Sequence, residues 1–185
     1  MKILLGSKSP RRQELLKNAG IQFTLVEIDC EENFPESMPL EDIAEYLAIK
    51  KSNAYANNLT GSVLITSDTT VIVDNKILNK PENEDQAIQM LMLLSGRMHR
   101  VLTGVCLRTD SQLMAFTDTT NVYFKDISQS EIEYYVSNYK PLDKAGAYGI
   151  QDWIGYIGIS RVEGDFFNVM GLPINRVYEM LKHLH

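Results

Sequence analysis

The stretch from Ser62 to Val73 restricts the fold of this chain more than any other part of the sequence. It reads as one continuous buried strand, with the runs VLIT and VIV on either side of an acid, Asp68. A carboxylate buried without a partner costs several kcal/mol. The strand therefore predicts that Asp68 is paired, bound to a metal ion or catalytic. The alternative is a broken strand in which Asp68 caps a turn.

Helical and extended patterns alternate along the rest of the chain. The expected strands cover residues 2–5, 23–28, 62–73, 77–78, 101–107, 113–124 and 154–161. One expected helix starts at Pro10, and two more cover residues 40–55 and 84–94. A fourth follows the Ser128–Glu131 capping box, and the last runs from Pro173 to about His183. Asp74-Asn75 predicts a hairpin turn. Because βα units are mixed with hairpins, the order favours an α/β fold with a mixed sheet.

Two arginines stand where the first turn of a helix normally carries acids. Ser9 and Pro10 are start signals for a helix that stops at Gly20. Arg11 and Arg12 follow them, at the end where unpaired N–H groups and the helix dipole are already positive. This departure indicates a functional site for a strong anion such as phosphate. The alternative is a pair of solvated arginines.

Size and charge restrict the class of protein. The chain has 185 residues, 44% of them hydrophobic and 23% charged, with a formal net charge of -6. These values are typical of one globular domain, residues 1–185, with one or two lobes. General nucleic-acid binding rests on many phosphate contacts and is disfavoured by the negative charge. The arginine pair therefore favours a small anionic ligand.

Cysteine usage and hydropathy indicate the compartment. Cys30 and Cys106 lack CxxC spacing, which argues against a disulfide framework or a zinc site and favours reduced thiols in the cytosol. We expect neither a signal peptide nor a membrane-spanning segment, because no apolar run is long enough.

Other charged side chains are candidates for binding the same anion. Glu31 and Glu32 form an acidic corner with oxygens that suit Mg²⁺, although paired acids in a loop are often only solvated. Lys50 and Lys51 lie at the edge of the apolar stripe of the second helix. Periodicity leaves open which of them turns inward, and whether its stem only snorkels. Lys80 is a further candidate for a phosphate contact.

The segment DKAGAYGIQ, residues 143–151, combines small residues with a charged pair. Its glycines allow a ligand to approach the backbone, and Gln151 could bond the edge of a base or sugar. A tight turn with an internal pair of Asp143 and Lys144 is the alternative.

The sequence has no Walker A loop, GxGxxG or HExxH motif. Its arginines, lysines and carboxylates are the groups used in metal-assisted attack on a phosphate.

Five motifs in combination resemble the Maf family of nucleotide pyrophosphatases. They cover essentially the whole chain in the family's order: LLGSKSPRRQELL, SDTTVIVDNKILNKP, LSGRMHRVLTGV, PLDKAGAYGIQ and VMGLP. The resemblance implies a two-lobed α/β fold with an elongated mixed sheet flanked by helices, similar to inosine triphosphate pyrophosphatases of the Ham1 type, and an active-site cleft between the lobes. It also implies hydrolysis of dTTP, UTP and modified pyrimidine nucleotides to the monophosphate and pyrophosphate, with Mg²⁺ or Mn²⁺, in the cytoplasm.

The resemblance assigns roles to residues. Asp68 would accept a proton, hold the metal together with Glu32 and Glu31, or do both, and Glu32 is the favoured member of the acid pair. The residues implied to bind the triphosphate are Ser7, Arg12, Lys51 and Lys80. Those implied to set base preference are Arg11, Thr69 and Gln151. Lys8 stands where small residues are common in the family, which would alter phosphate affinity slightly.

Two other functions are open at this point. One is a regulator of cell division that binds a nucleotide without hydrolysing it, because the family is linked to septum inhibition. The other is a 7-methyl-GTP pyrophosphatase, although that branch typically opens with an SPWRR-like motif. A homodimer is also implied. Each of these functions requires the Arg12 guanidinium and the Asp68 carboxylate to face one cavity that holds the phosphates.

Overall fold

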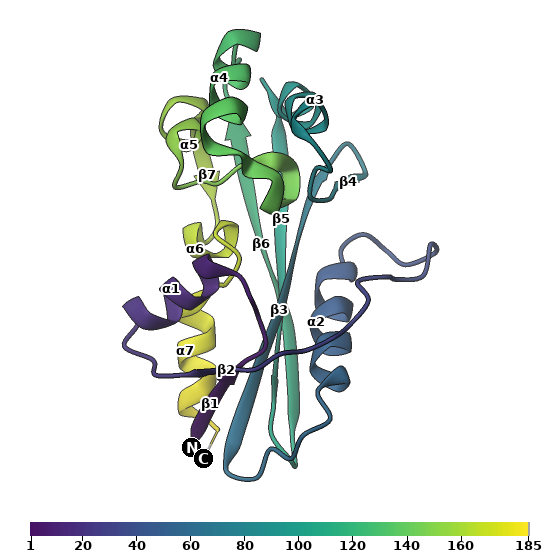
Figure 1. Ribbon diagram of the computed structural model, residues 1–185, viewed down its shortest axis with the longest axis vertical. Helices are drawn as coiled ribbons and strands as arrows, with labels where there is room; N and C mark the ends of the chain where they lie inside the picture. Colours follow the sequence, from purple (N-terminus) through teal and green to yellow (C-terminus); the bar gives the residue numbers. More distant parts are fainter. Residues whose placement is uncertain (185) are drawn as a thin grey trace. The chain divides into compact units, whose positions relative to one another are not determined.

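The computed structural model describes residues 1–184, and Figure 1 shows its elements. Its strands are β1 (Lys2–Leu5), β2 (Thr24–Leu25), β3 (Ser62–Val73), β4 (Lys76–Leu78), β5 (Met98–Arg108), β6 (Leu113–Phe124) and β7 (Ile159–Glu163). Its helices are α1 (Pro10–Asn18), α2 (Ile43–Ala54), α3 (Glu84–Leu94), α4 (Gln129–Tyr139), α5 (Trp153–Gly158), α6 (Phe166–Val169) and α7 (Ile174–Lys182), with 3-10 turns η1 (Pro141–Asp143) and η2 (Ala145–Ala147). Over these residues no helix has the length and apolar character that a bilayer crossing requires.

The strands form one mixed sheet. Its order is β2-β1-β3-β5-β6-β7, and β4 pairs with β3 outside this path. β1 is parallel to β2 and to β3, whereas β4 is antiparallel to β3 and β7 is antiparallel to β6. Parallel neighbours need crossover connections, which the segments containing α1 and α2 supply. The predicted mixed α/β fold is confirmed.

β3 runs without interruption from Ser62 to Val73, so Asp68 lies inside a continuous strand. The alternative of a broken strand is therefore wrong. After β3 the chain reverses through Asp74 and Asn75, which have φ angles of 46° and 59°. Two successive left-handed residues are typical of a type I′ hairpin turn, and the predicted turn is confirmed.

The chain forms two compact units, and β3, β5 and β6 contribute residues to both. The first unit contains residues 1–69, 103–118 and the described residues from 171 onward. The second unit contains residues 70–102 and 119–170.

Helices cover both faces of the strands in the first unit. Figure 1 shows α2 on one side of them and α1 with α7 on the other. Two consecutive residues of β6 point to opposite faces, as in any strand. The hydroxyl of Thr117 donates a hydrogen bond to Glu45 of α2 at 3.2 Å. The Phe116 side chain points the other way, and its ring centroid lies 3.9 Å from the guanidinium carbon of Arg176, on α7.

The core of the second unit is built on α3 and α4, which pack against each other. Both helices begin where the sequence predicts, and the predicted capping box opens α4. Their buried residues recur at helical spacing and are Ala87, Leu91 and Leu94 in α3, and Ile132, Tyr135 and Val136 in α4.

Residues 154–161 form the predicted strand only at their end. They begin inside α5, and β7 starts only at Ile159. A short apolar run cannot by itself distinguish a buried strand from a buried helical turn. Here Ile154 and Gly158 lie four residues apart and are buried, whereas Tyr156 between them is 82% exposed. Tertiary packing therefore selects a helix.

Two other predicted elements are shorter than expected. The strand predicted for residues 23–28 is reduced to β2, because its partner β1 ends at Leu5. The helix predicted for residues 40–55 begins only at Ile43. Before it, the carbonyls of Pro35 and Pro39 each accept a hydrogen bond from the amide three residues later, so the chain forms turns there.

Candidate active site

α2 brings Lys51 to Asp68. The hydroxyl of Thr66 in β3 donates to the carbonyl of Ala48 in α2 at 2.7 Å, which joins the two elements. Thr66 and Asp68 point to the same face of the strand, and Lys51 lies about one helical turn beyond Ala48. The Nζ of Lys51 consequently lies 2.5 Å from the Oδ1 of Asp68, and each side chain is 13% exposed. Asp68 is therefore paired, which is one of the three possibilities that the sequence left for a buried acid.

A glycine in β5 sets how closely α2 approaches the sheet. A Cβ on Gly104 would lie 2.2 Å from the carbonyl carbon of Ala44 and 2.3 Å from the amide nitrogen of Glu45. Both atoms belong to the backbone of the first turn of α2, so neither could move aside alone. Gly104 therefore determines the position of the helix that carries Lys51.

The acidic loop reaches the same lysine through its second member. The Oε1 of Glu32 lies 2.7 Å from the Nζ of Lys51, so a single ammonium bridges Glu32 and Asp68. Two carboxylates thus converge on one cation position. Mg²⁺ commonly takes one or two carboxylates, with water and substrate phosphate oxygens completing its shell. These two acids therefore fit a divalent cation, although residues 1–184 contain no cluster of three or more metal-ligating side chains.

The neighbouring residues have different contacts. Lys50 donates to the carbonyl of Asn33 at 2.9 Å, and Glu31 accepts a hydrogen bond from the side-chain amide of Asn33 at 3.0 Å. Lys51 is therefore the lysine that turns inward, as the family resemblance implied, and Lys50 contacts the loop.

Arg12 binds the edge of β3 just beyond the end of β1. The N–H of Gly6 donates to the carbonyl of Ile65 at 2.9 Å. Two residues further along β3, the carbonyl of Ser67 points to the same edge and accepts from the Nη1 of Arg12 at 2.9 Å. The Nη2 of Arg12 donates to the hydroxyl of Thr69 at 3.1 Å. Arg12 therefore contacts the residues on both sides of the buried acid.

Two further acceptors orient the Arg12 guanidinium. Its Nη1 also donates to the Oγ of Ser7 at 3.2 Å, and its Nε donates to the carbonyl of Gly171 at 2.7 Å. The hydroxyl of Ser67 donates to the same carbonyl at 3.3 Å. Sequence reasoning missed Ser67 and Gly171 as site residues. Their positions in the SDTT and VMGLP motifs are the signal that could have identified them.

The charge of Asp68 acts on Arg12. Burial lowers the pKa of the Arg12 guanidinium, and the Asp68 carboxylate acts in the opposite direction, more strongly than Glu32. The adjacent charge of Arg11 lowers the Arg12 pKa further. Arg12 and Asp68 therefore lie close enough to interact. It stays a prediction that the Arg12 guanidinium and the Asp68 carboxylate face one cavity that holds the nucleotide.

The hydroxyl of Thr69 is shared. It accepts from Arg12 and lies 3.0 Å from the hydroxyl of Thr103 in β5. Thr103 is another residue of the site that sequence reasoning missed, within the LTGV motif. The assignment of Thr69 and Arg11 to base selection stays a prediction.

The other two predicted residues, Lys80 and Gln151, belong to the second unit. The N–H of Gly146 donates to the carbonyl of Asn79 at 3.3 Å, which brings the segment before Lys80 to the 143–151 segment. The Asp143–Lys144 ion pair also forms, at 2.7 Å. Among residues 1–184, the Oε1 of Gln151 is buried and has no hydrogen-bond partner. An orphaned buried acceptor is costly, and a ligand donor would satisfy it.

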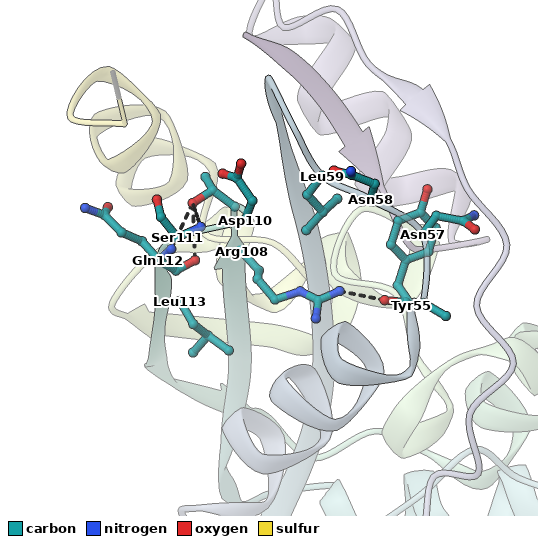
Figure 2. A pocket seen from close by; sticks show the side chains of 11 residues that line it. Tyr55, Asn57, Asn58, Leu59, Arg108, Asp110, Ser111, Gln112 and Leu113 are labelled. Atoms are coloured by element: carbon teal, nitrogen blue, oxygen red, sulfur yellow. Dashed lines mark hydrogen bonds between the residues drawn. The ribbon is translucent and has the colours of Figure 1, made fainter.

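A cavity of about 470 Å³ lies elsewhere in the first unit. Figure 2 shows that the chain after α2 and the turn between β5 and β6 line it. Arg108 reaches across and donates to the carbonyl of Tyr55 at 2.7 Å. The lining residues include none of the predicted site residues.

Comparisons with known proteins give matches that cover nearly the whole chain. A family model described as "Maf-like protein" matches residues 2–184. The dTTP/UTP pyrophosphatase of Phocaeicola vulgatus is 48% identical, over 99% of this chain and 96% of the relative. The dTTP/UTP pyrophosphatase of Bacteroides thetaiotaomicron is 46% identical, over 98% and 95%. Among solved structures, a HAM1 protein from Coxiella burnetii aligns over 99% of both chains, with 14% identity and a TM-score of 0.48.

Proposed function

This chain belongs to the Maf-like protein family, and we propose that it is a nucleoside triphosphate pyrophosphatase acting on dTTP and UTP. Relatives nearly half identical over almost the whole chain carry the name of that activity. The structural observation that carries the proposal is the buried Asp68, which pairs with Lys51 and lies between the two residues of β3, Ser67 and Thr69, that Arg12 contacts. An acid surrounded by cationic donors suits the hydrolysis of a phosphoanhydride.

In the proposed reaction, Asp68 is the proton acceptor. Its carboxylate takes a proton from a water molecule whose oxygen attacks the α-phosphorus. A bond forms between that oxygen and phosphorus, the bond from the α-phosphorus to the bridging oxygen breaks, and pyrophosphate leaves with the electron pair. The products are the nucleoside monophosphate and pyrophosphate.

The cationic side chains bind the triphosphate and offset charge on the departing pyrophosphate. Arg12 is already oriented by Ser7, Ser67, Thr69 and Gly171, so little ordering remains when the ligand binds. The flexible stem of Lys51 lets its ammonium turn from Asp68 to a phosphate oxygen. Lys80 completes the proposed triphosphate-binding set.

A divalent cation, Mg²⁺ or Mn²⁺, is part of the proposal. Asp68 and Glu32 would hold it, because both carboxylates converge on the position that the Lys51 ammonium takes. Glu31 stays a predicted third ligand. When bound, the cation supplies charge neutralisation on the phosphate oxygens.

Arg11, Thr69 and Gln151 are proposed to set the preference for a pyrimidine base. Modified pyrimidine nucleotides are further candidate substrates. A homodimer and a cytoplasmic location stay predictions from the family resemblance.

Phosphorus NMR of the protein incubated with dTTP and Mg²⁺ tests the proposed function. Equal amounts of pyrophosphate and dTMP are expected. Orthophosphate as the main product would indicate a phosphatase instead. Unchanged dTTP that binds tightly would indicate a nucleotide sensor, and faster release of pyrophosphate from 7-methyl-GTP would indicate the purine branch of the family.

A further inference from the structure

One hydroxyl group bonds the backbone of a residue before Gln151 and the side chain of the residue after it. The Oη of Tyr135, in α4, accepts a hydrogen bond from the N–H of Gly149 at 3.1 Å and donates one to the Oδ2 of Asp152 at 2.7 Å. Within the turn, the N–H of Asp152 donates to the carbonyl of Gly149 at 3.0 Å. The residues two before and one after Gln151 are therefore joined to each other and to the core.

Tyr135 is a rigid support for this turn. Its side chain is completely buried, and its ring stacks on that of Tyr139 at 5.1 Å between centroids. Burial and the bond to Asp152 both raise the pKa of Tyr135, so its hydroxyl stays protonated and remains a donor. A tyrosine held in this way positions its oxygen far better than a surface side chain could.

Glycine at position 149 allows the 149–152 turn to close around the Tyr135 hydroxyl. A Cβ on Gly149 would lie 2.5 Å from the Oδ2 of Asp152, so only glycine lets the carboxylate close over the backbone. One residue earlier, the hydroxyl of Tyr148 lies 2.6 Å from the Nε2 of the buried His99. Two buried aromatic side chains thus anchor consecutive parts of the segment.

The carboxamide of Gln151 is the group that this arrangement presents. Its Oε1 is buried yet lacks a protein partner among residues 1–184. Uracil and thymine carry a donor at N3, whereas cytosine carries an acceptor at the same position. A fixed acceptor therefore discriminates between these bases, because the wrong base leaves two acceptors facing each other.

We propose that Tyr135 is a positioning residue for base selection: its hydroxyl holds the 149–152 turn so that Gln151 accepts a hydrogen bond from N3–H of uracil or thymine. Tyr135 acts through the turn and does not touch the nucleotide. This inference rests on the proposed function and extends it from a substrate class to the device that selects the base.

The variant Tyr135→Phe tests the inference, because it removes the oxygen and keeps the ring. The ratio of kcat/KM for UTP to that for CTP is expected to fall by about fivefold, the value of one hydrogen bond. Tyr123→Phe is the matched control, since its hydroxyl donates to Glu163 at 2.6 Å, away from the turn. The control should keep the wild-type ratio.

A double-mutant cycle separates positioning from general destabilisation. In a Gln151→Ala background, Tyr135→Phe should leave the UTP to CTP ratio unchanged, because the group that Tyr135 positions is gone. An unchanged ratio in the single variant, or an equal loss on both nucleotides, overturns the inference. If Tyr135→Phe fails to fold, Asp152→Ala is measured in its place, since it removes the other end of the same hydrogen bond.

Binding distinguishes failure of the inference from failure of the proposed function. The affinities of dTMP and dCMP are measured by calorimetry for the wild type and for Tyr135→Phe. A wild type that prefers dTMP but hydrolyses no triphosphate contradicts the proposed function alone, and the two affinities then test Tyr135. A wild type that hydrolyses UTP but shows no preference over cytosine nucleotides in either measurement contradicts the inference alone.

Discussion

The Nε of Arg12 donates a hydrogen bond to the carbonyl of Gly171, 159 residues later in the chain, at 2.7 Å. The contact joins the start of α1 to the segment before α7, while the other nitrogens of the same guanidinium bind the edge of β3. Gly171 has a φ of 107°, a conformation that glycine adopts readily and other residues do not. Arg12 is thus both a proposed phosphate contact and a structural connection between distant parts of the first unit.

Replacing Arg12 by lysine should destabilise the protein. Lysine is a point charge that cannot reproduce the planar set of donors, so we expect the free energy of unfolding to fall by about 2–4 kcal/mol. Urea unfolding measures the change. Arg97→Lys is the control, because its partner Asp74 is exposed, and it should cost less than about 1 kcal/mol. An equal fall in unfolding free energy in the two variants would show that the buried hydrogen bonds of Arg12 stabilise the protein no more than an exposed ion pair does.

Removing the charge of Asp68 should abolish most of the activity while the protein stays folded. Asp68→Asn keeps the size of the side chain but cannot accept a proton, so kcat should fall on the order of 10²-fold or more. Release of pyrophosphate from dTTP measures this. Asp74→Asn, in the exposed hairpin turn, should keep wild-type turnover because asparagine tolerates a positive φ. Turnover near normal in Asp68→Asn would remove Asp68 from the mechanism.

Lys51→Met should affect both stability and substrate binding. The change leaves the buried Asp68 facing Glu32 without the bridging ammonium, and we expect a loss of about 3 kcal/mol in unfolding free energy together with a higher KM for dTTP. The double variant with Asp68→Asn should recover part of the lost stability, since the uncompensated charge is gone.

The adjacent lysine provides the control for this experiment. Lys50→Met removes a contact to the exposed loop at Asn33 and should change stability by less than about 1 kcal/mol. A loss as large as that of Lys51→Met would mean that the position of the ammonium between the two acids is unimportant.

His99 should make stability depend on pH. Burial lowers the pKa of His99 from 6.5 to about 3, so between these values the unfolded chain binds a proton that the folded protein does not. Stability therefore falls as the pH drops below 6.5, by about 2 kcal/mol between pH 7 and pH 5 from this group alone. Urea unfolding at both pH values should show that His99→Gln loses this part of the dependence. An identical dependence in the variant would contradict the assignment.

Local sequence signals correctly predicted several helix starts, turns and strands. The capping box at Ser128, the turn at Asp74 and the continuity of the strand through Asp68 all depend on backbone geometry within a few residues, which sequence encodes directly. The predicted strand was wrong for residues 154–158, where the apolar pattern suits a strand and a helix equally. There the decision came from the packing of Ile154 into the core.

Sequence by itself determined the family, the start of most elements and the requirement that the acid in β3 have a partner. Tertiary structure alone decided the contacts: the Lys51 ammonium, which the family resemblance had favoured over Lys50, bridges Asp68 and Glu32. It also decided that Ser67 and Gly171 support Arg12. The reason is physical. Helix caps and turns arise from neighbours in the chain, whereas each of these contacts depends on how closely separate elements pack, as Gly104 sets the distance of α2 from the sheet.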